Sequence, residues 1–116
     1  MTEQDIYKLL ADGERVTLEC KKAQNGVPNS LWETYSAFAN TNGGILLLGV
    51  YENVAEKDSM MRFTITGGED ADKIRKDLWN TINSREKVNV NLLHDEDVQT
   101  ISVNGKEVIA IHVPRA

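Results

Sequence analysis

Acidic and basic side chains alternate along one short segment near the start of the chain, Glu14-Arg15-Val16-Thr17-Leu18-Glu19-Cys20-Lys21-Lys22. Glu19 and Lys21 are two residues apart, so on a β-strand both side chains lie on the same face. In many nucleases an E-x-K pair of this kind places a lysine where it stabilises the charge that develops on a phosphate. Carboxylates also supply the oxygen ligands that Mg²⁺ and Mn²⁺ prefer. The segment therefore predicts a site for phosphates or a metal ion, to which Glu52, at the end of a later strand, can contribute.

The spacing of the two acids in this segment allows them to share a site only under one condition. Glu14 and Glu19 are five residues apart, which puts them on opposite faces of a continuous strand. They converge only if Glu14 lies in a bend directly after Gly13. The alternative is an ordinary solvated strand on which glutamate and lysine pair weakly across the surface.

Two sets of basic residues are candidates for contacts with nucleic-acid phosphates. The formal net charge of −5 opposes nucleic-acid binding, so any such surface must be a local patch. The stronger set flanks the polar strand. The weaker set lies on a predicted helix where Lys76 has Asp72 four residues before it, which favours a solvated, ion-paired face. The first set is Arg15, Lys21 and Lys22, and the second is Lys73 and Lys76.

The composition limits the class of protein. A chain of 116 residues predicts one domain over 1–116, and the end of the chain directly after Val113-Pro114-Arg115 suggests a module cut from a longer protein. The single cysteine, Cys20, excludes an intrachain disulfide and a multi-cysteine zinc site. The longest apolar run, 45–50, is far shorter than the roughly 20 residues of a membrane span. The acidic N-terminus does not resemble a signal peptide, so we expect no membrane partner and a cytoplasmic location.

The elements that would position these residues follow from hydrophobic periodicity. Thr2 with Asp5 predicts a helix start, and the apolar stripe ends near Gly13. Residues 15–22 alternate as a half-buried strand, and a second helix begins at Ser30. The block Asn40-Thr41-Asn42-Gly43-Gly44 predicts a tight helix-to-strand turn, more than an anion-binding loop, followed by one buried strand over 45–50.

The second half of the chain continues with mixed elements. We expect a strand over 62–66, an amphipathic helix over 70–84 and strands over 88–93, 98–103 and 107–113. The pair Asn104-Gly105 predicts a hairpin between the last two strands. The fold class is therefore α+β, with a mixed, mostly antiparallel sheet of about six strands and two or three helices.

With these residues in view, the chain resembles the Schlafen/AlbA-type domain, a family proposed to bind DNA. The motifs that carry the resemblance are the E-x4-E-x-K segment, the block Ala37-Phe38-Ala39-Asn40-Thr41-Asn42-Gly43-Gly44, the strand Leu48-Gly49-Val50 and the closing Val113-Pro114-Arg115. The resemblance covers residues 5–115. It implies an α+β, Schlafen AlbA-like fold and association with DNA or RNA, as in the N-terminal modules of bacterial transcriptional regulators and in Schlafen proteins.

In Schlafen relatives the resemblance also implies a metal-dependent ribonuclease built on three acidic residues. The corresponding positions here are Glu14, Glu19 and Glu52, with Lys21 as an electrostatic helper. The chain departs from the family at Tyr51-Glu52-Asn53, where relatives more often carry aspartate-rich residues followed by glycine. Glu52 reaches one methylene further than aspartate, which changes the metal geometry at that position.

Three functions from different classes follow. The leading hypothesis is a nucleic-acid-binding module of a transcriptional regulator that needs no cofactor. The second is an endoribonuclease that uses Mg²⁺ or Mn²⁺. The third is an oligomerisation or sensor module that regulates a downstream domain of the same full-length chain, for which the edge of the 98–113 hairpin offers a homodimer contact.

Overall fold

The computed structural model describes residues 1–11, 18–22, 27, 30–53, 55, 63–67, 71–82 and 94–115. Its helices are α1 (Glu3–Ala11), α2 (Ser30–Ala39), α4 (Ala71–Ile82) and the short 3₁₀ helix η1 (Asp95–Asp97). Its strands are β1 (Leu18–Lys21), β2 (Gly44–Leu48), β3 (Val50–Glu52), β4 (Phe63–Ile65), β5 (Val98–Val103) and β6 (Lys106–Val113). The predicted α+β class is confirmed, whereas the strand predicted over 88–93 lies outside the described residues.

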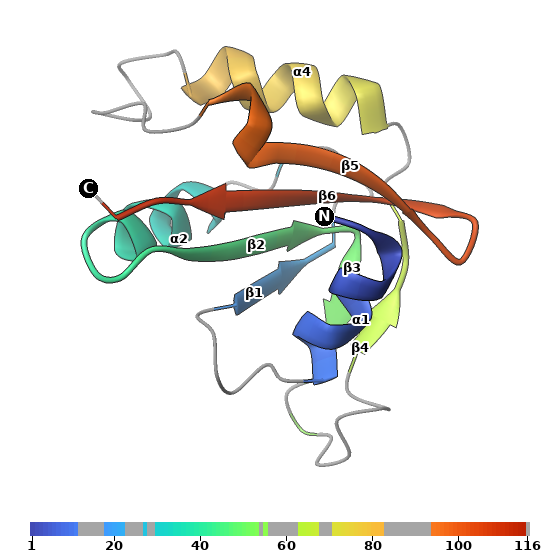
Figure 1. Cartoon of the computed structure of the whole chain (residues 1–116). Helices are drawn as coiled ribbons and strands as arrows, with labels where there is room; N and C mark the ends of the chain where they lie inside the picture. The colour runs from blue at the N-terminus through green and yellow to red at the C-terminus, as the bar shows by residue number, and fades with distance from the viewer. Residues whose placement is uncertain are drawn as a thin grey trace.

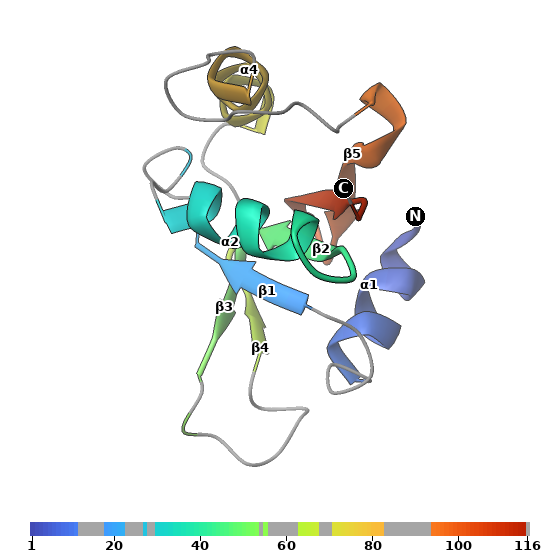
Figure 2. The ribbon, with the colours of Figure 1, turned by 90° about the vertical axis from the view of Figure 1, so that its left-hand side faces the viewer.

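Four strands form the main sheet in the order β1-β2-β6-β5 (Figure 1). β1 and β2 are parallel, and the other two pairs are antiparallel. The predicted hairpin between β5 and β6 is confirmed, with both turn residues, Asn104 and Gly105, at positive φ. β3 and β4 form a separate two-stranded antiparallel ribbon that projects from the end of β2, below β1 in Figure 2. We call this pair the β3–β4 ribbon.

The two faces of the main sheet hold different apolar clusters. One face, here called the helix face, packs the apolar sides of α2 and α4 against Leu46 and Leu48 of β2. The other face, the ribbon face, packs α1 and the inner side of the β3–β4 ribbon against Leu47. Successive β2 residues enter opposite clusters, as strand periodicity requires. The predicted two-sided burial of this strand is therefore confirmed.

Local signals explain where α1 begins and where α2 ends. The backbone N–H of Thr2 donates to Asp5 Oδ2 at 2.8 Å, and the Asp5 N–H donates back to Thr2 Oγ1 at 3.3 Å. The two bonds form the predicted reciprocal cap of α1. At the end of α2, Gly43 at φ +77° donates its N–H to the Phe38 carbonyl at 2.8 Å. A Cβ on Gly44 would lie 2.6 Å from the Phe38 ring, so both glycines are required by the close return of the chain.

The prediction of one continuous strand over 45–50 is wrong, because the chain bends at Gly49. Gly49 has φ +98°, a conformation that side chains with a Cβ rarely adopt. Its N–H donates to the Lys21 carbonyl at 2.8 Å, and its own carbonyl accepts from the N–H groups of Thr66 and Gly67 at 2.9 Å each. The bend ends β2, starts β3 and holds both to the end of β1.

Within the described part of the chain, no helix is both long and apolar enough to span a bilayer.

Candidate functional site

The end of β1 and the start of the β3–β4 ribbon are neighbours in space. Parallel pairing sets Lys21 of β1 opposite Leu48 of β2, one residue before the Gly49 bend. The bend then carries β3 alongside β1, and residues of the two strands are in contact. Side chains near positions 20 and 50 therefore meet at one edge of the sheet.

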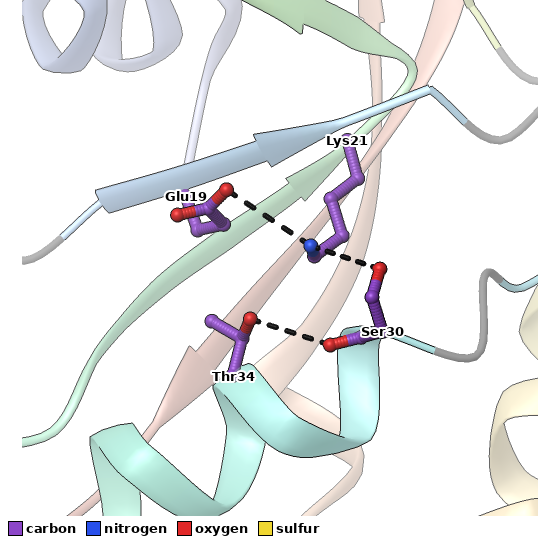
Figure 3. Close-up of polar contacts among 4 residues, drawn as sticks. All are labelled: Glu19, Lys21, Ser30 and Thr34. Atoms are coloured by element: carbon purple, nitrogen blue, oxygen red, sulfur yellow. Dashed lines mark hydrogen bonds and ion pairs between the residues drawn. The ribbon is translucent and has the colours of Figure 1, made fainter.

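Glu19, Lys21 and Ser30 form a polar group on the helix face at this edge (Figure 3). Both β1 residues share their face with Leu46 and Leu48, their β2 partners in the register. The Lys21 ammonium donates to Ser30 Oγ at 3.1 Å and lies 3.9 Å from Glu19 Oε1. The Lys21 side chain is 16% exposed and that of Glu19 is 42% exposed. At that separation and exposure the ion pair contributes little to stability, about 0–1 kcal/mol.

Ser30 is the first residue of α2, so the Lys21 ammonium lies at the N-terminal end of that helix (Figure 3). The helix dipole puts partial positive charge at this end, which adds to the charge of the lysine. In the same turn Thr34 Oγ1 donates to the Ser30 carbonyl at 3.4 Å. The carboxylates of Glu19 on β1 and of Glu33 in the first turn of α2 offset this positive charge.

Lys22 points to a different neighbour. Its ammonium lies 4.5 Å from the centroid of the Tyr51 ring, a cation–π contact. Tyr51 is on the outer side of the β3–β4 ribbon, opposite the exposed Thr64, and it is 43% exposed. Val50 and Glu52, its neighbours along β3, lie on the inner side with Ile65 and Phe63, their β4 partners. The two consecutive lysines, Lys21 and Lys22, thus contact different neighbours on different sides of the strand.

Cys20 directly precedes these lysines in sequence and is buried on the ribbon face. Burial, then the negative charges of Glu52 and Glu19, raise the pKa of its thiol to about 12. The thiol therefore stays protonated near neutral pH and acts as a small apolar group. The negative charges of both carboxylates thus act on the same thiol.

The carboxylates of the predicted metal site are divided between the two faces. Glu19 is on the helix face with Leu46, and Glu52 follows the inner side of the ribbon. Among the described residues, no group of three or more His, Cys, Asp or Glu side chains is arranged to hold a metal ion. Glu14, the third predicted ligand, lies outside the described residues, as does Arg15. The described residues therefore do not fit a metal site by themselves.

Lys73 and Lys76 are far from this edge in the topology. Both are exposed on α4, which contacts β6, and β2 separates β6 from β1 in the sheet order. Arg75, between them, is partly buried and donates to the Val98 carbonyl at 2.7 Å, so it fixes α4 to β5. Lys73 and Lys76 therefore lie on a different surface from Lys21 and Lys22.

In the 40–44 turn, the N–H groups of Asn40, Thr41 and Gly43 are directed to the end of α2. The Asn40 N–H donates to the Ser36 carbonyl at 3.0 Å, and the Thr41 N–H donates to that of Phe38 at 3.2 Å. Thr41 Oγ1 donates to the Ala37 carbonyl at 2.9 Å. These donors are hydrogen-bonded to carbonyls at the end of the helix, so they are not directed toward an anion.

Two residues of the site were not among the predicted ones. Ser30 is expected as a helix cap, and nothing in its position along the chain connects it to Lys21. Tyr51 is expected only as the neighbour of Glu52, because a continuous strand over 45–50 hides the change of direction at Gly49. A glycine that interrupts an apolar run is the signal that points to such a bend.

Comparison with known proteins connects this arrangement to a family. The family model described as Schlafen, AlbA_2 matches residues 14–116. The solution NMR structure of the N-terminal domain of a protein related to the ATP-dependent DNA helicase RecG, from Nitrosomonas europaea, is 30% identical with a TM-score of 0.75. The alignment covers 100% of this chain and 74% of that one.

A second solved structure shows the fold alone. The DIP2311 protein from Corynebacterium diphtheriae is 24% identical with a TM-score of 0.58, and the alignment covers 97% of this chain but 22% of that chain. No curated protein matches the sequence.

Proposed function

The chain belongs to the Schlafen AlbA_2 family, and on this basis we propose that it binds nucleic acid through phosphate contacts at the end of β1. The observation that supports this most is the pair of consecutive lysines there. The Lys21 ammonium contacts Ser30, and the Lys22 ammonium contacts the Tyr51 ring. The two cations therefore lie on either side of one sheet edge. A phosphate backbone that crosses this edge can contact both.

The proposed contacts differ in character. Lys21 is held in place by Ser30, so it loses little side-chain freedom when it meets a phosphate. Lys22 is exposed and adapts to the backbone it meets. Such contacts release counterions, so affinity falls steeply as salt rises. Arg15, Lys73 and Lys76 complete the proposed set of cations.

Fluorescence anisotropy with labelled single-stranded DNA, duplex DNA and RNA tests the proposal at low and moderate salt. We expect binding at low salt that weakens in the Lys21→Gln/Lys22→Gln double variant. The salt slope of that variant should fall by about 1.4 for a single strand and about 1.8 for a duplex, the values for two lost phosphate contacts. Lys8→Gln, an exposed lysine on α1, is the control for each unit of lost charge.

The same titration with Lys73→Gln/Lys76→Gln compares the two basic surfaces. A larger loss of affinity in the α4 double variant than in the β1 double variant would place the binding surface on α4. If the wild-type chain binds none of the three nucleic acids at low salt, the proposal is wrong.

We propose further that the domain serves as the nucleic-acid-binding module of a transcriptional regulator. In this proposal it acts together with a downstream domain of the same chain, and two copies of the chain form a homodimer. The family and the likeness to an N-terminal domain support the module and the downstream domain. The contact that we expect in the homodimer is the edge strand β5 of the main sheet. Light scattering across a concentration series tests the homodimer, and a monomer mass at all concentrations contradicts it.

The second candidate function is a metal-dependent ribonuclease that uses Glu14, Glu19 and Glu52 with Lys21. The observation that favours it is the E-x-K pair, in which Glu19 and Lys21 lie 3.9 Å apart. Labelled RNA incubated with Mn²⁺ and either the wild type or Glu19→Gln tests it. Cleavage that disappears in the variant supports the nuclease, and equal cleavage by both proteins excludes Glu19 as a ligand.

A further inference from the structure

Tyr51 is the aromatic side chain at the proposed binding edge, and it lies on the outer, solvent-facing side of the ribbon. It is 43% exposed, whereas Val50, the residue before it, is fully buried. Its cross-strand partner on the ribbon is Thr64, a small exposed residue. The strand fixes the backbone under the ring, and Lys22 supplies a cation 4.5 Å from the ring centroid. An exposed ring on a rigid element beside a cation is a surface for stacking.

The charge of the chain indicates which nucleic acid such a surface suits. A net charge of −5 limits the affinity that phosphate contacts alone can supply. Stacking on an aromatic ring adds affinity that does not depend on net charge, because every base has a π-face. A duplex keeps those faces inside its base-pair stack, whereas a single strand presents them. The combination of an acidic domain and an exposed tyrosine therefore favours a single strand.

We propose that Tyr51 and Lys22 form a stacking site for single-stranded nucleic acid. One base lies on the ring face that the Lys22 ammonium now covers, and the ammonium moves to the adjoining phosphate. The exchange is favourable because an exposed cation–π contact is weaker than the stacking of a base. This site rests on the proposed function and deepens it, since it specifies the class of nucleic acid.

The test compares single-stranded and duplex oligonucleotides of the same sequence with three variants of the 116-residue chain. Tyr51→Ala should weaken single-strand binding about 5- to 150-fold, the range for one lost stacking contact. It should change duplex binding much less. Tyr51→Phe keeps the ring and should bind the single strand about as well as the wild type. Tyr7→Ala removes a tyrosine that is 47% exposed on α1 and is the matched control.

A direct signature of stacking accompanies the affinities. Ring protons of Tyr51 should shift upfield in NMR spectra when the single strand is added, and those of Tyr7 should not. Near-wild-type single-strand affinity in Tyr51→Ala overturns the stacking site, and so does an equal loss on single strand and duplex. Those results leave the proposed function standing, provided that the wild type binds nucleic acid. Absence of all binding by the wild type at low salt overturns both.

Discussion

The helix face and the ribbon face of the sheet are both buried, but they end differently at the β1 edge. On the helix face, α2 begins beside β1 and its first residue, Ser30, accepts a hydrogen bond from Lys21. On the ribbon side, the ribbon buries only its inner residues and leaves Tyr51 in solvent under Lys22. Two adjacent lysines thus have different freedom, since strand alternation sends them to opposite sides. The ribbon side is therefore where we expect a ligand to displace an existing contact.

The largest expected effects come from the two cores themselves. Leu46 enters the helix-face cluster and Leu47 the ribbon-face cluster, and both are fully buried. Either substitution to alanine should lower the free energy of unfolding by about 2–5 kcal/mol, through lost burial and the cavity left behind. Urea denaturation measures both. A cost below about 1 kcal/mol for Leu47→Ala would contradict a true core on the ribbon face.

The bend that separates the sheet from the ribbon gives the next effect. A Cβ on Gly49 would lie 3.0 Å from the Gly67 carbonyl carbon, and the residue has φ +98°. Gly49→Ala should therefore cost about 2–4 kcal/mol, from backbone strain and crowding together. Gly105→Ala is the control, because its φ of +76° is also positive but a Cβ there meets nothing within 4 Å. Equal costs for the two variants would mean that close packing at the bend adds nothing.

The buried thiol makes the ribbon face sensitive to alkaline pH. The pKa of Cys20 is raised from 9.0 to about 12, so above about pH 9 the unfolded chain loses the thiol proton while the native state keeps it. Stability then falls as pH rises, by up to about 1.4 kcal/mol per pH unit until about pH 12. Cys20→Ala removes this component. Between about pH 8 and about pH 10, the urea midpoint of the wild type should fall relative to that of the variant. A constant difference between the two midpoints would contradict the buried, neutral thiol.

The smallest expected effects concern two polar contacts, one on each face of the sheet. One fixes a helix to β5, and the other fixes a helix to the turn that follows β5. Arg75 of α4 donates to the Val98 carbonyl at 2.7 Å, and Glu3 of α1 accepts from the Asn104 N–H at 2.6 Å. Arg75→Met should cost about 1–2 kcal/mol, because the contact is charged and partly buried. Glu3→Gln should stay within about 0.5 kcal/mol, since that contact is exposed. Thermal unfolding ranks the two, and the reverse order would show that α1 depends more on its polar contact.

Much of the fold could be predicted from short-range patterns. The cap at Thr2 and Asp5, the stop at Gly43-Gly44 and the hairpin at Asn104-Gly105 each depend on residues a few positions apart. The shared face of Leu18 and Cys20 follows in the same way from the alternation of side chains along a strand. Such signals are local, so they can be recognised without knowing the rest of the structure.

The candidate site could be predicted only in part, because its partners come from separate elements. The E-x-K spacing indicates that Glu19 and Lys21 share a face, and the two side chains do so. The contact of Lys21 with Ser30 depends on where α2 returns over the sheet, and that of Lys22 with Tyr51 depends on the bend at Gly49.

By itself, the sequence determined the fold class, most of the helices and strands and the polar character of β1, because side-chain periodicity and turn residues act over a few positions. Only the tertiary structure decided which neighbours the two lysines have and that Glu19 and Glu52 lie on different sides of β1. The physical reason is that strand pairing and one glycine bend set these distances, and both depend on burial of apolar surface across the whole chain.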